Sequence, residues 1–201
     1  MAAVDQFNHA EVTAAILAGG EGRRVDGHDK GLLPLAGKPL IAHIAAALSG
    51  QANTLLICTS RHERDYAVFG RVVHDATSGF RGPLAGIATA LAHCTTPWLL
   101  TVPVDGPNLP AGLALRLHLA ALAGNAKAAV ANDGTRSQPL FALYRRALAA
   151  SAANALARDL PAWRWQEKIG AVQADFSDLP QAFANLNTLD EFRDWERRHA
   201  S

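Results

Sequence analysis

Short apolar runs alternate with amphipathic stretches along most of the chain, and this alternation limits the possible folds more than any other feature. The apolar runs predict strands over 12–17, 54–59, 71–74, 98–102, 128–131, 139–144 and 172–176. The stretches between them predict helices over 39–48, 61–68, 83–94, 111–122, 145–158 and 188–198. Strands and helices that alternate at this spacing favour an α/β fold, a three-layer sandwich around a mostly parallel sheet.

The size and charge of the chain exclude several classes of protein. Its length suits one well-packed domain, so we expect residues 1–201 to form a single domain. Apolar residues make up 49% of the chain, which excludes intrinsic disorder. The net charge is +1, so bulk charge attracts neither nucleic acid nor an anionic membrane. The sequence shows no secretory signal and no bilayer-spanning apolar run, so we expect a cytoplasmic protein.

The segment LAGGEGRRVDGHDKGLLPLAGKPL, residues 17–40, is the strongest candidate for a ligand site. It follows the first predicted strand, and ligands bind beyond the carboxyl ends of strands in such sheets. Its glycines allow backbone amides to approach a ligand, and its cations suit a triphosphate. These residues are Gly19, Gly20, Gly22, Arg23, Arg24 and Lys30. The spacing matches neither a Walker A loop nor G-x-G-x-x-G, and a surface turn with solvated charges is the alternative.

Asp105 is the strongest candidate for a metal ligand. It follows an apolar strand within the segment LLTVPVDGPNLP. A carboxylate there could hold Mg²⁺, which prefers one or two carboxylates plus substrate phosphates. Asp-Gly is also a common turn pair, so a structural turn is an equal alternative. Gly82 and Pro83 open a predicted helix whose free amides could face a phosphate, or they could simply begin the helix.

Later segments allow both functional and structural interpretations. Residues 133–139 predict a hairpin turn that contains Arg136. Asn185 and Asn187 share one face if the chain is extended there, and Thr188 could cap the last helix. The two cysteines, Cys58 and Cys94, are predicted to be buried apolar residues. The four tryptophans are predicted to serve in packing, with a base-stacking platform as the alternative: Trp98, Trp163, Trp165 and Trp195. No histidine is predicted to be catalytic, because none has a triad-like partner; those considered are His43, His93 and His199.

Taken in order, these segments resemble the signature of the molybdenum cofactor guanylyltransferases. The matching elements are L-A-G-G-x-x-x-R at 17–24, D-K-G-L at 29–32, G-K-P-L at 37–40, G-P-L-A-G at 82–86, V-P-x-D-x-P at 102–107 and N-x-N-T at 185–188. The resemblance implies a nucleotidyltransferase fold, Rossmann-like and of GT-A type. It also implies transfer of GMP from Mg-GTP to the terminal phosphate of molybdopterin, with release of pyrophosphate.

The resemblance also implies residue roles, with the nucleotide in the N-terminal half and the acceptor in the C-terminal half. The nucleotide-binding residues would be Leu17, Ala18, Gly19, Gly20, Gly22, Arg23, Lys30, Asp75, Gly82 and Asp105. The catalytic residues would be Lys30, Arg24 and Asp105, with Asp105 holding Mg²⁺. The acceptor-binding residues would be Arg136, Asn185 and Asn187. Two positions depart from many family members: Val25-Asp26 replaces Met-Gly, and Cys58 stands where some members carry Asn.

The implied partners are GTP and the molybdopterin cofactor, with maturation proteins of molybdoenzymes as further candidates and a monomer as the expected state. One alternative function is a related nucleotidyltransferase that uses CTP on the same cofactor or a nucleotide on a sugar phosphate. Another is a non-catalytic nucleotide-binding regulator or chaperone. Lys30 and Asp105 favour an enzyme, because a pure binding protein needs no transition-state charge stabilisation.

Overall fold

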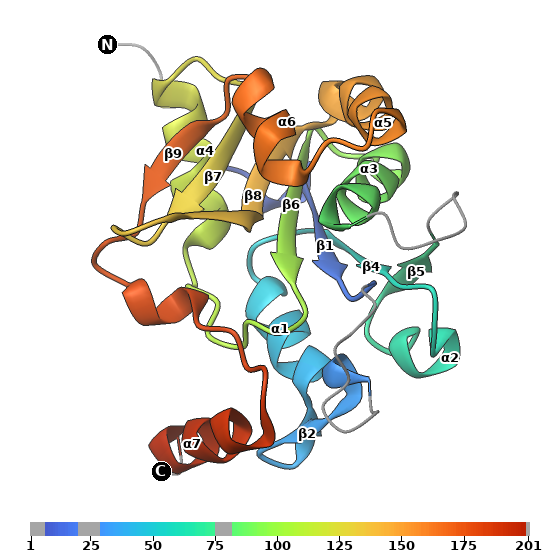
Figure 1. Cartoon of the computed structure of the whole chain (residues 1–201), viewed down its shortest axis with the longest axis vertical. Helices are drawn as coiled ribbons and strands as arrows, with labels where there is room; N and C mark the ends of the chain where they lie inside the picture. The colour runs from blue at the N-terminus through green and yellow to red at the C-terminus, as the bar shows by residue number, and fades with distance from the viewer. Residues whose placement is uncertain (1–6, 20–28, 75–81, 200–201) are drawn as a thin grey trace.

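The computed structural model of the protein describes residues 7–19, 29–74 and 82–199. Within these residues, seven strands form one sheet in the order β5-β4-β1-β6-β8-β7-β9 (Figure 1). The strands are β1 (Val12–Leu17), β4 (Thr54–Cys58), β5 (Arg71–Val73), β6 (Trp98–Pro103), β7 (Ala128–Asn132), β8 (Ser137–Arg145) and β9 (Val172–Asp175). A separate two-stranded hairpin consists of β2 (Pro34–Leu35) and β3 (Lys38–Pro39).

The sheet is mostly parallel, as predicted. β1 pairs in parallel with β4 and β6, β4 with β5, and β7 with β9. β8 runs antiparallel to both of its neighbours, β6 and β7. The tight turn between β7 and β8 reverses the chain, and a short turn of this kind can join only antiparallel strands. The hairpin predicted at 133–139 is therefore confirmed.

Helices cover both faces of the sheet, although their lengths differ from the prediction. They are α1 (Leu40–Leu48), α2 (Glu63–Tyr66), α3 (Pro83–His93), α4 (Leu113–Ala123), α5 (Ala149–Ala157), α6 (Ala162–Lys168) and α7 (Leu189–His199). Short 3₁₀ turns are η1 (His9–Glu11), η2 (Lys30–Leu32), η3 (Arg146–Leu148) and η4 (Pro180–Phe183). The sequence patterns missed α6, and α2 is shorter than the helix predicted over 61–68.

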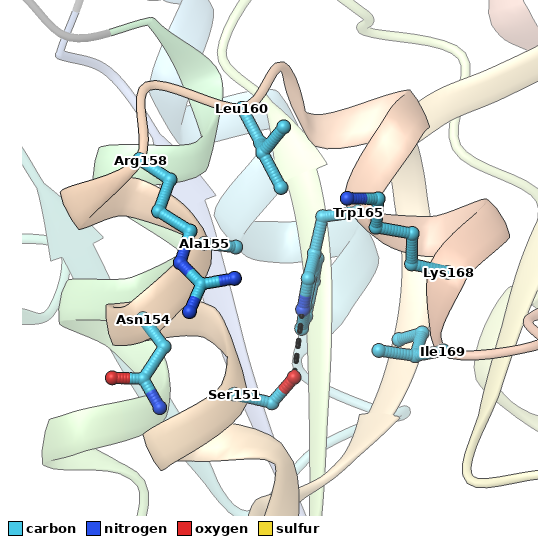
Figure 2. Close-up of a pocket in the computed structure, with 8 residues that line it drawn as sticks. All are labelled: Ser151, Asn154, Ala155, Arg158, Leu160, Trp165, Lys168 and Ile169. Carbon is cyan, nitrogen blue, oxygen red and sulfur yellow. Dashed lines mark hydrogen bonds between the residues drawn. The ribbon is translucent and has the colours of Figure 1, made fainter.

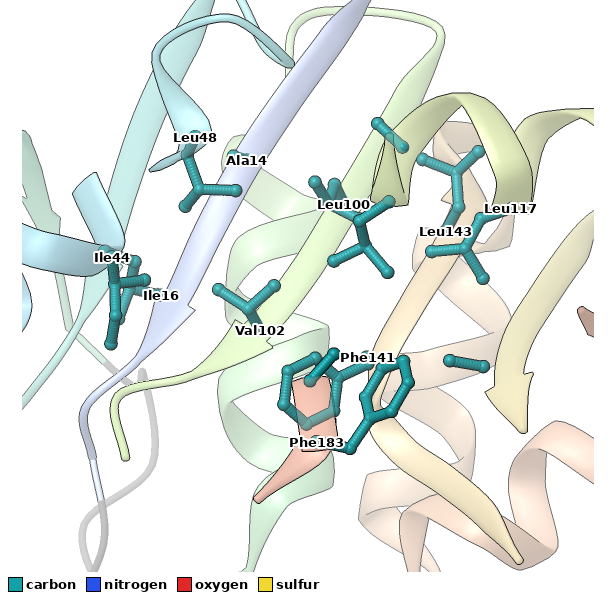
Figure 3. Packing of buried hydrophobic residues seen from close by; sticks show 14 of the residues in the cluster. Ala14, Ile16, Ile44, Leu48, Leu100, Val102, Leu117, Phe141, Leu143 and Phe183 are labelled. Atoms are coloured by element: carbon teal, nitrogen blue, oxygen red, sulfur yellow. The ribbon is translucent and has the colours of Figure 1, made fainter. Parts of the chain in front are cut away.

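Two apolar clusters sandwich the sheet. One lies between the sheet and α1, α4 and α7 and includes Ile16, Leu100 and Leu143 (Figure 3). The other lies between the opposite face and α3, α5 and α6 and includes Leu99 and Tyr144. Leu99 and Leu100 are neighbours in β6 but belong to opposite clusters, because side chains alternate along a strand. All of β6 is buried, as expected for a strand covered on both faces, so the three-layer sandwich is confirmed.

The predictions hold for both cysteines and for three of the four tryptophans. Cys58 and Cys94 are both buried, and they form no disulfide with each other. Three tryptophans are buried, which confirms their packing role, whereas Trp163 is 50% exposed and its role stays a prediction. It lies in α6 two positions before the buried Trp165, and positions that close on a helix face different directions. Among the helices that the structure describes, none has the length and apolar composition to span a membrane.

Candidate functional site

The carboxyl ends of β1, β4 and β6 meet at one edge of the sheet (Figure 1). Leu17, the last residue of β1, is aligned with Cys58 of β4 and Pro103 of β6. Beyond it, the Ala18 N–H donates to the Cys58 carbonyl oxygen at 2.9 Å. Gly19 is exposed, and a Cβ there would lie 3.4 Å from the same carbonyl oxygen. The predicted backbone segment Leu17-Ala18-Gly19 therefore follows this edge.

Asp105 lies two positions beyond the end of β6, and its backbone is fixed from two directions. The Val104 N–H donates to the Leu17 carbonyl at 3.2 Å, and the Leu186 N–H donates to the Asp105 carbonyl at 2.9 Å. The carboxylate is 21% exposed, and its Oδ2 accepts from Lys30 Nζ at 3.2 Å. Its Oδ1 is buried and has no hydrogen-bond partner among the described residues. A buried polar atom of this kind costs free energy unless a ligand satisfies it.

Lys30 joins residues from both ends of the chain. Its Nζ donates to Asp105 Oδ2 and also to Asn187 Oδ1, the latter at 2.8 Å. The Lys30 side chain is only 14% exposed. A cation, a carboxylate and an amide predicted from three separate motifs thus form one cluster.

The turn that carries Lys30 depends on two residues, Asp29 and Tyr66, that were not predicted as site residues. Asp29 caps η2, and its Oδ1 accepts from the Gly31 N–H at 3.1 Å. The hydroxyl of Tyr66, on α2, donates to the same oxygen at 2.5 Å. Asp29 could have been suspected, because it precedes Lys30 and aspartate favours caps. Tyr66 is distant in sequence and gives no local signal.

Asn187 is held by the start of α7. The N–H groups of Asn187 and Thr188 donate to Glu191 Oε2 at 2.5 and 2.8 Å, and the Glu191 N–H donates to Thr188 Oγ1 at 3.2 Å. This reciprocal pattern is a capping box, so the predicted capping role of Thr188 is confirmed. The Asn187 N–H, followed by the Thr188 N–H, lowers the pKa of Glu191 although partial burial opposes them.

Asn185 and Arg136 lie outside the cluster of Lys30, Asp105 and Asn187. Asn185 is exposed, and its Oδ1 would lie 3.8 Å from a Cβ added to Gly106, so it faces the loop that carries Asp105. The Arg136 side chain is 75% exposed, with its Nε 3.8 Å from Asp133 Oδ2 in the same turn. The acceptor role of both residues stays a prediction.

Gly82 lies at the N-terminus of α3, as predicted, and its φ of +71° favours glycine. One turn later, a Cβ on Gly86 would lie 3.1 Å from Leu17 Cδ2, so α3 begins near the end of β1. The remaining predicted site residues and the variable loop tip fall outside the described residues. They are Gly20, Gly22, Arg23, Arg24, Asp75 and Val25-Asp26.

Asp105 fits a magnesium ion that obtains most of its ligands from a substrate. Within the described ranges, no group of three or more His, Cys, Asp or Glu side chains could hold a metal. Asp105 provides one carboxylate with an unpartnered oxygen. Mg²⁺ is commonly held by one or two carboxylates together with phosphates and water. The residues present are therefore consistent with a metal that arrives with a nucleotide.

A pocket of about 460 Å³ lies between α5 and α6 (Figure 2). It is lined in part by Arg158 and Lys168, and the Trp165 Nε1–H donates to Ser151 Oγ at 3.1 Å across it. None of the predicted site residues that the structure describes lines this pocket. The cluster of Lys30, Asp105 and Asn187 therefore lies elsewhere, near the strand ends.

Comparisons with known proteins point to the same family as the sequence motifs. A family model described as the MobA-like NTP transferase domain matches residues 14–173. The molybdenum cofactor guanylyltransferase of Shewanella halifaxensis is 40% identical over 184 residues, which cover 90% of this chain and 92% of the relative. The protein of the same name from Shewanella loihica is 42% identical over 183 residues, covering 90% and 93%.

A solved structure shares the fold. Molybdopterin-guanine dinucleotide biosynthesis protein A from Archaeoglobus fulgidus superimposes with a TM-score of 0.77 at 21% identity, covering 94% of this chain and 98% of that one. Similarity at this level of identity establishes the fold alone. The predicted nucleotidyltransferase architecture is therefore confirmed.

Proposed function

The chain belongs to the MobA-like NTP transferase family, and we propose that it transfers GMP from GTP to the terminal phosphate of molybdopterin. Pyrophosphate is the leaving group. The observation that carries the proposal is the pairing of Lys30 with Asp105 at the strand ends, where Asp105 Oδ1 is buried and unpartnered. This arrangement provides a cation for phosphates and a carboxylate oxygen for a metal.

The reaction needs charge neutralisation and positioning more than covalent chemistry. An oxygen of the acceptor phosphate attacks the α-phosphorus of GTP, and the bond between that phosphorus and pyrophosphate breaks. The Lys30 ammonium stabilises the charge that grows on the transferred group and on pyrophosphate. Asp105 would hold Mg²⁺, which would supply neutralisation of the phosphate charge. The acceptor phosphate is already ionised at neutral pH, so no general base is required.

The N-terminal half of the chain binds the nucleotide, and the C-terminal half binds the acceptor. In our proposal, the backbone of Leu17, Ala18 and Gly19 lies along the nucleotide, and Gly82 presents the start of α3 to it. Asn187, bonded to Lys30, lies on the acceptor side together with Asn185. The family resemblance adds Gly20, Gly22, Arg23, Arg24 and Asp75 to the nucleotide site and Arg136 to the acceptor site. A monomeric state, a cytoplasmic location and contacts with maturation proteins stay predictions.

Calorimetric titration with GTP, CTP and ATP, each with Mg²⁺, tests the proposal. We expect selective binding of GTP and formation of the guanine dinucleotide when molybdopterin is added. Asp105→Ala should weaken Mg-GTP binding about tenfold and abolish turnover, because it removes the metal ligand. Asp178→Ala is the matched control, since Asp178 pairs with Arg116 on the surface and lies in none of the motifs.

Each other outcome leads to a different conclusion. Selective binding of CTP would identify a cytidylyltransferase of the same fold. Nucleotide binding without turnover would favour the regulator or chaperone. Normal activity of Asp105→Ala with Mg²⁺ would remove Asp105 from the metal site, and absence of all nucleotide binding would overturn the proposal.

A further inference from the structure

The turn that carries Lys30 is anchored by a carboxylate that bonds in two directions. Asp29 Oδ1 accepts one hydrogen bond from the Gly31 N–H at 3.1 Å and another from the Tyr66 hydroxyl at 2.5 Å. The Leu33 N–H closes the turn by donating to the Lys30 carbonyl at 3.2 Å. The backbone of Lys30 is therefore tied, through Asp29, to the side chain of Tyr66.

Tight packing strengthens this link. A Cβ on Gly31 would overlap the Tyr66 hydroxyl and lie 2.7 Å from Val104 Cγ2. Gly31 thus sits between the phenol and the residue immediately before Asp105. Because the turn contacts both, a shift of the Tyr66 hydroxyl would change the position of Lys30 relative to Asp105.

Tyr66 is placed as a buried hydrogen-bond donor. It is fully buried, whereas the other residues of α2, Glu63 to Asp65, are exposed. Burial, followed by the hydrogen bond to Asp29, raises the pKa of the phenol, so it is protonated at neutral pH and donates. Phenylalanine would fill most of the same volume, so the hydroxyl contributes polar contact more than apolar packing.

We propose that Tyr66 is a positioning residue for Lys30. Its hydroxyl holds Asp29, Asp29 holds the η2 turn, and the turn directs the Lys30 ammonium to the space between Asp105 and Asn187. The inference rests on the proposed function, because it takes Lys30 to act on the phosphates. Tyr66 itself touches no reacting group in this proposal and acts through Lys30.

The ammonium group of a long, flexible lysine side chain is positioned better when the backbone of that lysine is held in place. Lysine has four rotatable side-chain bonds, and a displacement of about 1 Å in a reacting group can lower a rate about 100-fold. We expect Tyr66→Phe to lower kcat about tenfold and to change KM for GTP less than about threefold, because alignment matters most in the transition state.

A double-mutant cycle separates positioning from general stability. The turnover of Tyr66→Phe, Lys30→Ala and the double variant is compared with that of the unmodified protein at saturating GTP and molybdopterin. If Tyr66 acts through Lys30, Tyr66→Phe lowers kcat about tenfold when Lys30 is present and less than about twofold in Lys30→Ala. Tyr144→Phe is the matched control, since Tyr144 is also fully buried and its hydroxyl accepts from Gln166. Its effect on kcat should be equal in both backgrounds.

The remaining outcomes decide against the inference. An equal loss from Tyr66→Phe in both backgrounds, or a lower melting temperature with unchanged kcat, would overturn it and leave the proposed function intact. Unchanged turnover in Lys30→Ala would overturn both this inference and the proposed role of Lys30. If Tyr66→Phe does not fold, Asp29→Ala takes its place in the cycle, because it removes the same link from the opposite side, and the same expectations apply.

Discussion

Lys30 occupies a position between groups that we assign to different substrates. Its ammonium bonds Asp105, the proposed metal ligand, and Asn187, the proposed acceptor-side amide. An ammonium has three donors, so Lys30 can donate to a phosphate oxygen while it keeps both of these partners. The two partners compensate the charge of a largely buried cation before substrate binds, which avoids the cost of leaving that cation alone.

Asn187→Ala tests the assignment of Asn187 to the acceptor side. We expect KM for molybdopterin to rise about tenfold, because a lost hydrogen bond to a charged group costs about 1.5 kcal/mol. The affinity for GTP should change less than about twofold. Initial rates at varied molybdopterin and calorimetry with GTP measure the two effects, with Asn154→Ala in α5 as the control. A weaker affinity for GTP at unchanged KM for molybdopterin would move Asn187 to the nucleotide side.

Single site residues can be identified from the sequence when they follow a motif or a predicted strand. Lys30 and Asp105 follow motifs or strands, so their approach to a common edge could be predicted. Tyr66 could not, because its role depends on a contact across 37 positions with Asp29. Nothing near Tyr66 distinguishes it from an ordinary core aromatic. Only the folded geometry shows which oxygen its hydroxyl meets.

Among the elements, α7 shows how a capping box at the start of a helix also determines the position of a residue in the candidate site. Thr188 and Glu191 form the capping box at its start, and the same box holds the backbone of Asn187. The carboxylate also lies at the positive end of the helix dipole. The stability of α7 and the placement of the Lys30 partner therefore depend on one ionised side chain.

The lowered pKa of Glu191 predicts an acid-sensitive helix. A depressed pKa means that the folded state favours the carboxylate, so this contribution to stability is complete above the ordinary value of 4.5 and is lost as pH falls through the lower folded-state value. The melting temperature of the unmodified protein should therefore exceed that of Glu191→Gln at neutral pH. The difference should shrink as the pH falls below the ordinary value of 4.5. A difference that stays constant as the pH falls, measured by thermal unfolding, would contradict the prediction.

The helices and strands were predicted correctly where apolar runs were continuous. The predictions failed where tertiary contacts determine the length or position of an element. The core strands β1, β4 and β6 are such runs and were predicted almost to the residue. The helix α6 was missed because it spans only Ala162–Lys168, with the tryptophans Trp163 and Trp165 on different faces. The short helix α2 follows His62, whose φ of +52° breaks the predicted helix. The insertion of β8 between β6 and β7 leaves no mark in the sequence pattern.

For the molecule as a whole, α7 brings the end of the chain back to its beginning. Trp195 is 7% exposed, and its Nε1–H donates to Asn108 Oδ1 at 2.7 Å. Glu196 Oε1 accepts from the Ala36 N–H at 2.7 Å, in the loop between β2 and β3. His43 of α1 packs edge-on against the Trp195 ring. The C-terminal helix is therefore part of the same core as the N-terminal half.

Trp195→Ala tests whether α7 is part of the core. We expect the free energy of unfolding to fall by about 3–5 kcal/mol, as for other large-to-small core changes. Trp163→Ala is the matched control and should cost less than about 1 kcal/mol, because Trp163 is 50% exposed. Denaturant unfolding measures both. Equal losses in the two variants would show that α7 is not an integral part of the core.

The bond between Lys30 and Asn187 joins positions that are 157 residues apart. A ribosome therefore adds Asn187 long after it has added Lys30. Until then a nascent chain presents Lys30 without its partner amide, even if β1, β4 and β6 have already paired. The cluster of Lys30, Asp105 and Asn187 can therefore form only after the intervening residues have been synthesised, so no shorter nascent chain contains the complete site.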